Sequence, residues 1–536
     1  MSKPDRGAMS RREFLAAGGA GLAAAGLGEK GMAAAVSVKP FALEEATIAD
    51  LGARMREGSI SAEKLAAAYL ERMQEIDGGG PTLRSVIETN PDALDIAAAL
   101  DRERRDGRVR GPLHGIPIVV KDNIATGDRM MTTAGSLALE GLHVREDAPL
   151  VRRLREAGAV LLGKSNLSEW ANFRSSNSLS GWSSRGGQTR NPYALDRSPS
   201  GSSSGSAVAA ASNLCAAAIG TETDGSITSP SACNGLAGLK PTLGLVSRSG
   251  IVPIAHSQDT AGPMARSVED CALLMNALAG PDPEDRITTE KRVPRGVDFT
   301  AELARTDLRG VRLGVGRQFF GAFERADRVI ESALSALRDL GATLVDVEFP
   351  GLGKFDEAEL DVLFHEFKHD LNAWLARYAP DARVRSLADV IAFNEANAAR
   401  VMPVFGQDLL VKTQASGSLR TAKYLKAVAT CRRYARTQGI DAVVKKSRVD
   451  AIVALTSQPA WIVDPVNGDI TKGGCTSLAA VAGYPHLTVP AGFAGALPVG
   501  ISFFGPAFSD ARLLGIGHAF ERATRHRRPP RFEASA

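Results

Sequence analysis

Residues 198–242 read SPSGSSSGSAVAAASNLCAAAIGTETDGSITSPSACNGLAGLKPT, and the rest of the sequence is interpreted outward from this stretch. Two Ser/Gly clusters, at 201–206 and 223–226, flank an alanine-rich apolar run. A flexible Ser/Gly linker has polar flanks and buries nothing, whereas these clusters enclose a segment that is small enough to pack tightly. Glycine and serine at such positions bring backbone N–H groups and hydroxyls close to a substrate. The stretch therefore predicts a substrate-binding part of a fold.

The flanking sequence alternates between helical and strand-like patterns. Residues 60–76 place apolar side chains at helical spacing behind a capping Ser61. Short β-branched runs predict buried strands at 115–120, 159–162, 311–315, 343–348, 451–455, 487–489 and 499–504. Helical patterns lie between several of these runs, at 92–106, 151–157 and 328–340. Because helices that alternate with strands are typical of α/β folds, we predict an α/β core.

No linker-like composition and no internal repeat divides the chain of 536 residues. We therefore expect one domain over residues 40–530, although length alone is a weak guide to domain number. From 355 to 445 the pattern is mostly helical. We expect this helical block to cover the core and to shape a substrate pocket.

The N-terminus has the pattern of an export signal. Residues 10–15 read SRREFL, a twin-arginine signature, and a weakly apolar run follows at 16–27. Alanines at 33–35 offer a cleavage site of the A-x-A type. The run is too short and too rich in glycine for a membrane span, so we expect no membrane association beyond export. Residues 1–35 are thus predicted to be a twin-arginine signal that sends the protein to the periplasm or outside the cell.

The composition excludes some classes of partner and cofactor. With 64 basic and 60 acidic residues, the chain gives no reason to expect a nucleic-acid partner. The one basic run, at 522–531, is interpreted as a solvated C-terminal tail. The five cysteines have no metal-ligand or CxxC spacing, so we expect small buried side chains, with no required disulfide and no metal or other cofactor. They are Cys215, Cys233, Cys271, Cys431 and Cys475.

The Ser/Gly stretch contains no histidine, although the whole chain has eight. A lysine can take the place of a histidine base when burial lowers its pKa, because the loss of water disfavours the ammonium form. Lys121 directly follows the apolar run at 115–120 and ends the strand expected there. On position alone, a lysine that extends from the end of a strand into solvent is the simpler interpretation.

Three motifs belong together: GPLHGIPIVVKDN at 111–123, PSGSSSG at 199–205 and GTETDGSI at 220–227. They resemble the amidase signature family, whose members hydrolyse amides with a Ser–cis-Ser–Lys triad. The first is similar to the family's lysine motif, the second resembles the loop that carries the cis-serine, and the third resembles the run that holds the nucleophile. GLKPT at 238–242 and QDTAGPMARS at 258–267 extend the resemblance over nearly the whole mature chain.

The resemblance implies a fold, a triad and an oxyanion hole. The fold is a large mixed β-sheet covered by helices on both faces. Ser226 is implied to be the nucleophile, Lys121 the base, and Ser202, 24 residues before Ser226, a proton relay that follows a cis peptide bond and is hydrogen-bonded to both. Backbone N–H groups of four residues would bind the oxyanion. They belong to Thr223, Asp224, Gly225 and Ser226.

Two positions depart from the wider family, because Asp224 and Ser204 stand where most members have glycine. With NLSEWANFR at 166–174 and SRGGQTRNPY at 184–193, they resemble the peptide amidase branch, whose members deamidate the C-terminal carboxamide of peptides. We therefore expect a peptide or small-molecule amide substrate, and a monomer or homodimer. Asn172, by its position in the family's loop, is expected to contact the substrate, and an asparagine that only stabilises a turn is the alternative.

Other functions remain as alternatives. Relatives with the same triad hydrolyse aryl anilides, so an aryl acylamidase is the first. The amidase subunit of tRNA-dependent amidotransferases is the second, and an exported chain with balanced charge fits it poorly. Residues 201–205 also match the G-x-S-x-G elbow of α/β-hydrolases, with Ser203 as nucleophile. The elbow needs a preceding strand, whereas residues 191–200 contain two prolines and have the pattern of a loop.

Two further motifs match by short patterns that are common by chance. HEFKH at 365–369 matches the H-E-x-x-H helix of zinc hydrolases, with His365 and His369 as ligands and Asp389 as a conceivable third. Both histidines lie off the apolar stripe of this helix, on a flank that we expect to be solvated. Ser61 begins an S-x-x-K match to penicillin-binding proteins, but no K-T-G follows, and a helix cap is the better interpretation.

Overall fold

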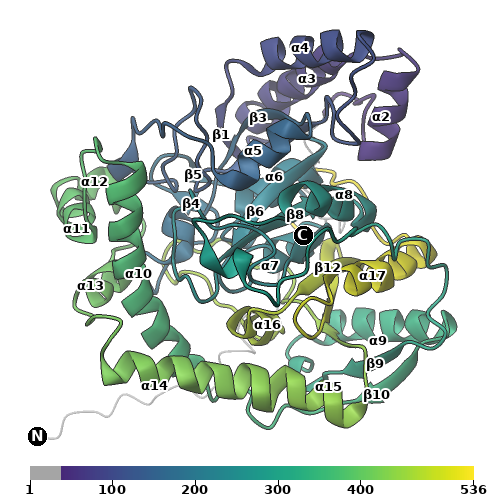
Figure 1. Ribbon diagram of the computed structural model, residues 1–536, viewed down its shortest axis with the longest axis vertical. Helices are drawn as coiled ribbons and strands as arrows, with labels where there is room; N and C mark the ends of the chain where they lie inside the picture. The colour runs from purple at the N-terminus through teal and green to yellow at the C-terminus, as the bar shows by residue number, and fades with distance from the viewer. Residues whose placement is uncertain (1–37) are drawn as a thin grey trace, which may run out of the picture. The chain divides into compact units, whose positions relative to one another are not determined.

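Eleven strands form one mixed β-sheet in the computed structural model, which describes residues 38–536 (Figure 1). The pairs β3–β2–β6 and β11–β9–β10 are parallel, the strands between β6 and β11 are antiparallel, and the edge strand β1 pairs antiparallel with β3. A separate hairpin pairs β4 (Trp182–Ser183) with β5 (Gly187–Gln188). In sheet order the strands are β1 (Val86–Thr89), β3 (Val160–Ser165), β2 (Pro117–Lys121), β6 (Ala217–Glu222), β8 (Thr260–Ala265), β7 (Ala237–Lys240), β12 (His486–Ala494), β13 (Leu497–Phe504), β11 (Ala451–Leu455), β9 (Arg312–Val315) and β10 (Thr343–Asp346).

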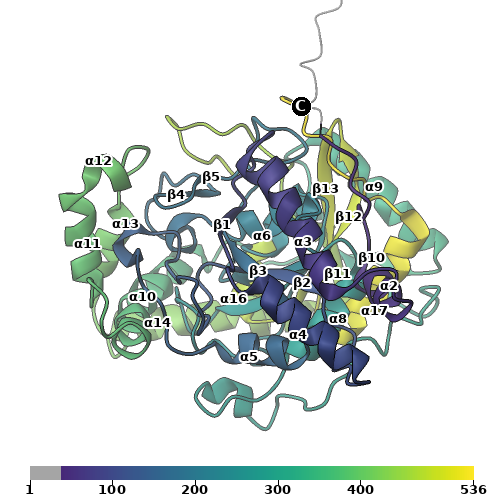
Figure 2. The same cartoon turned by 90° about the horizontal axis from the view of Figure 1, so that it is seen from above.

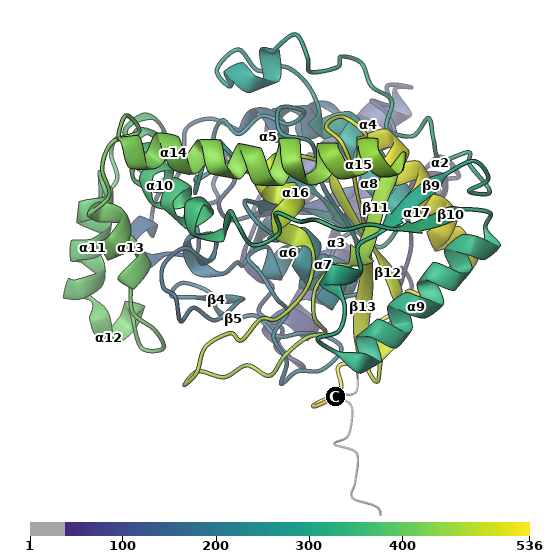
Figure 3. The same ribbon diagram turned by 90° about the horizontal axis from the view of Figure 1, so that it is seen from below.

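Helices surround this sheet. They are α2 (Ile48–Arg56), α3 (Ala62–Arg72), α4 (Ala93–Arg105), α5 (Pro149–Glu156), α6 (Ser204–Ala211), α7 (Thr228–Cys233), α8 (Val268–Leu278), α9 (Glu324–Asp339), α10 (Asp356–Tyr378), α11 (Leu387–Ala396), α12 (Ala398–Val401), α13 (Asp408–Gln414), α14 (Ala422–Cys431), α15 (Asp441–Ser447), α16 (Thr476–Ala482) and α17 (Asp510–Thr524). Short 3-10 or π turns are η1 (Met73–Gly78), η2 (Leu137–Leu139), η3 (Glu169–Asn172), η4 (Arg286–Thr289), η5 (Arg317–Phe319) and η6 (Arg432–Ile440). Within the helical block, α11 to α13 lie together away from the sheet (Figure 2), and α14, η6 and α15 follow one another nearly in line (Figure 3).

The side chains of β12 show that helices cover both faces of the sheet. Leu487 and Val489 contact α17 at Gly517. Thr488 lies between them in the sequence, and because side chains alternate along a strand it points to the opposite face. Ala232 of α7 packs on that face. The predicted α/β fold, with a mixed sheet between two layers of helices, is confirmed.

All seven predicted strands formed, whereas β1, β4 and β5 were missed, as were the central strands β6, β7 and β8. Their sequences, AAIGTE, AGLK and TAGPMA, contain mostly small residues that have weak strand propensity. All positions of these three central strands are buried. Small side chains allow neighbouring segments to pack closely here: a side chain at Gly205 of α6 would collide with the carbonyl oxygen of Ser85.

The C-terminal basic run is solvated only in part, because Arg522, Arg525, Arg528 and Arg531 are exposed whereas Arg527 is not. Arg527 is only 10 % exposed and forms an ion pair with Glu45 at 2.7 Å. Its guanidinium also donates to the carbonyl oxygens of Gly235 (2.7 Å) and Ala211 (3.0 Å). This arginine carries five N–H donors, and the acceptors that they find in the fold hold the run against it.

Two further expectations concern the cysteines and the membrane. All five cysteines lie within the described residues, and all are buried free thiols, as predicted. Among residues 38–536, no helix has the length and apolar character needed to span a bilayer. The predicted export signal at 1–35 lies outside the described residues.

Candidate active site

The fold brings the three candidate triad residues to one edge of the sheet. Lys121 is the last residue of β2, and β6 runs parallel beside it. The carboxyl ends of parallel strands meet at the same edge, so Ser226, four residues after β6, lies near the end of β2. Ser202 precedes α6, and its neighbour Ser203 donates its N–H to the carbonyl oxygen of Ser226 at 3.1 Å. The two Ser/Gly clusters are therefore adjacent in space.

Lys121 is completely buried and does not extend into solvent. Its Nζ lies 2.8 Å from Ser202 Oγ and 3.0 Å from Ser203 Oγ. Thr221 supplies a hydroxyl at 2.9 Å and a carbonyl oxygen at 3.3 Å. Burial lowers the pKa of Lys121 to about 7, although the carboxylates of Asp259 and Glu222 act in the opposite direction. Near neutral pH a large share of this amine is therefore uncharged and able to accept a proton.

The structure contains one of the two hydrogen bonds of the implied relay, the one between Lys121 and Ser202. The Gly201–Ser202 peptide bond is cis, as the resemblance implies. The Ser202 carbonyl oxygen accepts the N–H of Ser168 at 3.1 Å. Ser226 is 7 % exposed, and within the described chain its hydroxyl forms no hydrogen bond, so the expected contact with Ser202 is not made. Hydrogen bonds of this kind are often long without substrate and shorten in the substrate complex.

Backbone N–H groups of the oxyanion loop, residues 223–226, remain free of protein acceptors in the described part of the chain. The next two N–H groups, of Ile227 and Thr228, both donate to Glu222 Oε2, at 2.7 and 2.9 Å. Gly225 has φ of 75°, and an added Cβ would lie 3.0 Å from the Thr476 hydroxyl, so only glycine fits. The loop therefore offers unpaired donors beside Ser226, which is what a developing oxyanion requires.

Comparisons with known proteins agree with this geometry. A family model described as Amidase matches residues 64–514. The chain belongs to the amidase signature family. A probable amidase of Arabidopsis thaliana is 40% identical over 505 residues, which cover 92% of this chain and 93% of that protein.

Two solved structures are more similar in sequence. The native peptide amidase of Stenotrophomonas maltophilia is 52% identical, with a TM-score of 0.87, and covers 92% of this chain and 100% of its own. The structure of a peptide amidase with the competitive inhibitor chymostatin is also 52% identical, with a TM-score of 0.89, and covers 91% and 100%. The protein is thus an amidase, a hydrolase that acts on linear amides.

Asp224 is held at the edge of the amidase's oxyanion loop. Its Oδ2 accepts a hydrogen bond from Ser477 Oγ at 2.6 Å. Its Oδ1 is buried and has no partner among residues 38–536. Burial raises the pKa of this carboxyl to about 6, and the nearby carboxylates of Glu222 and Asp356 add to the effect. A carboxylate with one unused oxygen therefore lies two residues before Ser226, the candidate nucleophile.

Asn172 lies at the end of η3, in left-handed backbone with φ of 75°. Asparagine tolerates this conformation, which agrees with a turn residue. Its side-chain Oδ1, however, is buried without a partner within the described chain, so the side chain does not bond to the turn. The adjacent Phe173 packs on Phe364 and Phe367 of α10, with ring centroids 5.7 and 5.3 Å apart. Asn172 is thus adjacent to a residue that packs on α10, the first helix of the helical block.

The residues of the rival H-E-x-x-H motif do not form a metal group within the described chain. His365 is buried rather than solvated, because its ring lies against Tyr424 of α14, 5.6 Å between centroids. Its Nδ1 is hydrogen-bonded to the Asp361 carbonyl oxygen at 2.6 Å. The candidate metal group that residues 38–536 do form consists of His256, Glu366 and Asp370, with ligand atoms within 4.8 Å of one another. It includes neither histidine of the motif.

The other rival motifs are explained by their surroundings. Ser203 is completely buried, its hydroxyl donates to the Thr221 carbonyl oxygen at 3.0 Å, and no strand precedes it in residues 191–200. It supports Lys121 and does not form a nucleophile elbow. Ser61 caps α3 by accepting the N–H of Lys64 at 3.1 Å, as predicted.

Several supporting residues were missed from the sequence, namely Thr221, Ser203, Glu222, Gln258 and Asp259. Each acts through contacts that only the fold creates. Their one sequence signal is that they lie inside the matched motifs, at 199–205, 220–227 and 258–267.

Proposed function

We propose that Ser226, Ser202 and Lys121 hydrolyse amides through an acyl-enzyme. The observation that carries the proposal is the completely buried Lys121 amine, 2.8 Å from Ser202 Oγ. A buried amine with a pKa of about 7 serves as a base at neutral pH. No carboxylate or histidine contacts Nζ among the described residues, so Ser202 is its route to the nucleophile.

In the first half-reaction, Ser226 Oγ attacks the amide carbon and forms a C–O bond. Its proton passes to Ser202, while the Ser202 proton passes to Lys121 Nζ. The carbonyl oxygen becomes negative and is bound by N–H groups of the oxyanion loop, Thr223, Asp224, Gly225 and Ser226, where each donor is worth roughly 3 kcal/mol. The C–N bond then breaks, and the leaving nitrogen takes a proton back from Lys121 through Ser202.

In the second half-reaction, water replaces the amine. Its proton follows the same route to Lys121 and its oxygen bonds to the ester carbon. The bond to Ser226 then breaks, and the Ser226 oxygen takes the proton back from Lys121 through Ser202. The products are a carboxylic acid and ammonia or an amine. All steps use groups of the chain and water.

We further propose peptide C-terminal carboxamides as the substrate class. The support is the similarity to the peptide amidase structures, one of which binds chymostatin. The free oxygens of Asp224 and Asn172 add to it, because they are acceptors that suit the N–H groups of a carboxamide or a peptide. Aryl anilides, with one N–H and a large apolar leaving group, leave more of these acceptors unpaired.

A substrate panel tests both proposals. Peptide carboxamides, aryl anilides and fatty amides are compared by kcat/KM, with Ser226→Ala as control. We expect the peptide carboxamides to be preferred by at least about tenfold, the discrimination that one charged hydrogen bond supplies. A preference for anilides would identify an aryl acylamidase instead. Amide hydrolysis that survives in Ser226→Ala would overturn the triad.

Export by the twin-arginine route is a separate proposal, supported by the SRREFL motif and the A-x-A site. The test is fractionation of cells that express the full chain or the variant in which both Arg11 and Arg12 are lysine. We expect the full chain in the periplasm or medium and the variant inside the cell. Equal distribution of the two would contradict export through this motif.

A further inference from the structure

One face of α10 accepts hydrogen bonds from the segment just before β8, residues 256–259. Glu359, Glu366 and Asp370 are spaced by seven and four residues, so they lie on one side of the helix. They contact three consecutive residues of the facing segment, in reverse order. Gln258 Nε2 donates to Glu359 Oε1 at 2.8 Å, Ser257 N to Glu366 Oε2 at 2.9 Å, and His256 N and Nδ1 to Asp370 Oδ2 at 3.0 and 2.8 Å.

The segment 256–259 is also hydrogen-bonded to Thr223, once at its hydroxyl and once at its carbonyl oxygen. Asp259 Oδ1 accepts the Thr223 hydroxyl at 2.5 Å, while its Oδ2 accepts the N–H groups of Ile254 and Ala255 at 2.8 and 2.9 Å. Gln258 Nε2, besides its bond to α10, donates to the Thr223 carbonyl oxygen at 3.2 Å. All three of these anchoring residues, Thr223, Gln258 and Asp259, are buried.

The contact with the Thr223 carbonyl has a direct consequence for catalysis. A peptide group is planar, and in a trans peptide the C=O of one residue points opposite to the N–H of the next. The Thr223 carbonyl therefore shares its plane with the Asp224 N–H, one of the proposed oxyanion donors. When Gln258 holds the carbonyl, it also sets the direction of that N–H.

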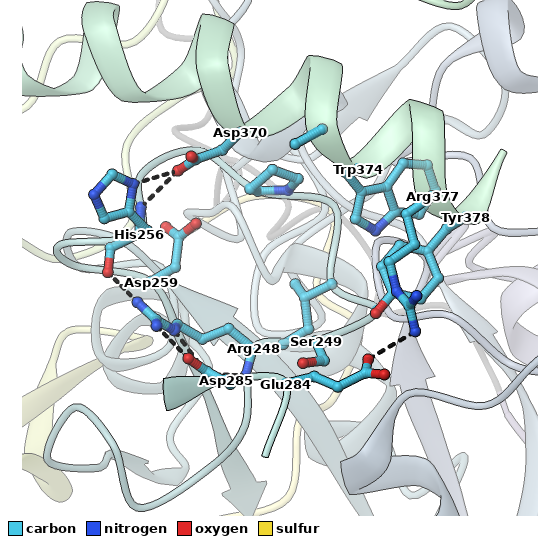
Figure 4. A pocket seen from close by; sticks show the side chains of 14 residues that line it. Arg248, Ser249, His256, Asp259, Glu284, Asp285, Asp370, Trp374, Arg377 and Tyr378 are labelled. Carbon is cyan, nitrogen blue, oxygen red and sulfur yellow. Dashed lines mark hydrogen bonds and ion pairs between the residues drawn. The ribbon is translucent and has the colours of Figure 1, made fainter. Parts of the chain in front are cut away.

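Figure 4 shows how the segment is braced on its other side. His256 and Asp370 are hydrogen-bonded to each other, and both line, with Asp259, a cavity of about 460 Å³. Arg248 donates to the His256 carbonyl oxygen and forms an ion pair with Asp285 (Figure 4). The segment is thus fixed between α10 and Arg248, so it has little freedom to change its hold on Thr223.

We propose that Gln258 and Asp259 are positioning residues for the oxyanion loop, and that the acidic face of α10 holds them in place. The inference rests on the proposed role of residues 223–226 as the oxyanion hole. It makes the helical block part of the catalytic machinery through contacts with the loop, in addition to any contact with substrate.

The first test removes each of the two hydrogen bonds to Thr223 by a substitution that changes the shape of the side chain little. In Gln258→Met and Thr223→Val, kcat for whichever amide the wild type hydrolyses is expected to fall about 10- to 100-fold, with KM within about threefold, because a misdirected oxyanion donor acts only in the transition state. Thr223→Ser keeps the hydroxyl and should restore kcat. The control is Gln318→Met, which replaces an exposed glutamine whose amide is hydrogen-bonded to both backbone groups of Phe349, outside the site.

A second readout separates positioning from a merely structural role. The charge of Asp259 opposes the effect of burial on the pKa of Lys121. Asp259→Asn should therefore move the acidic limb of the kcat/KM profile to lower pH, whereas Thr223→Val should leave the limb in place. In the double variant Asp259→Asn/Thr223→Val, kcat should fall no further than in the worse of the two single variants. Both substitutions disrupt the same hydrogen bond, between the Thr223 hydroxyl and Asp259.

The outcomes distinguish this inference from the proposed function. If Gln258→Met and Thr223→Val keep kcat within about twofold of wild type, or lose activity through KM alone, the positioning role is wrong while the triad stands. If Ser226→Ala keeps its activity, the triad itself fails. Far-UV circular dichroism and thermal unfolding of each variant show whether the fold is retained. If Gln258→Met unfolds, the comparison of Thr223→Val with Thr223→Ser decides the matter.

Discussion

The signature stretch, residues 198–242, and the helical block, residues 356–447, are built in different ways. Nearly every residue of the signature stretch is buried and small, and its key contacts join neighbouring backbone groups, as between Ser203 and Ser226. The helical block exposes many charged side chains and reaches the site through long side chains, as between Glu359 and Gln258, 101 residues apart. The close backbone contacts of the candidate site are made within one short stretch of sequence, whereas the contacts that position its loop join residues far apart in the chain.

The largest effect should come from the signature stretch. Ser226→Ala removes the nucleophile and is expected to lower kcat by about 10⁴-fold or more, because the remaining groups cannot form the ester. Mass spectrometry of the wild type quenched during turnover should show an acyl adduct on the peptide that contains Ser226. An adduct on Ser203 instead would show that the assignment of Ser226 as the nucleophile is wrong.

The next effect tests how the helical block is attached. Arg174 is completely buried, pairs with Glu169 at 2.9 Å and donates to the carbonyl oxygens of Val401 and Phe405, at 2.8 and 2.9 Å. Arg174→Met leaves Glu169 buried without its partner, so the free energy of unfolding should fall by about 3–5 kcal/mol.

The control for this prediction is an exposed arginine of the same block. Arg377 is 49% exposed and pairs with Glu284, so Arg377→Met should cost less than about 1 kcal/mol in denaturant titrations. Equal losses in the two variants would show that the buried pair does not attach the block.

A smaller effect is expected where the two regions meet. Asp224→Gly keeps the backbone N–H but removes the free carboxylate oxygen, so kcat/KM for a peptide carboxamide should fall by about tenfold relative to an anilide. Asp356→Ala, which removes an exposed acid nearby, is the matched control. An unchanged ratio would remove Asp224 from substrate selection.

The smallest effect is predicted for the zinc-like motif. His365 only packs on Tyr424 and bonds to its own helix, so His365→Gln should keep kcat/KM within about twofold. A strong chelator should leave the wild-type rate unchanged, since no step of the proposed mechanism uses a metal. Loss of activity in either experiment would bring a metal back into the reaction.

The sequence predicted the fold class from local patterns, and it indicated the candidate triad through three motifs that resemble a known family. Most strands rich in β-branched residues and the three Ser, Gly and Lys motifs could be recognised without tertiary information. The alanine- and glycine-rich β6 could not, because burial between neighbours overrides its weak propensity. The burial of His365 and Arg527, and the grip of Gln258 on Thr223, depend on partners far along the chain, which no local pattern contains.

The most direct test of the central claim, that buried Lys121 is the base, is the pH dependence of kcat/KM. Because Lys121 must be neutral and its pKa is lowered to about 7, the rate should rise about tenfold per pH unit below about 7 and level off above it. Lys121→Ala should lose this limb and more than about 10³-fold in rate. A flat wild-type profile across this range, or a Lys121→Ala rate within about tenfold of wild type, would contradict the claim.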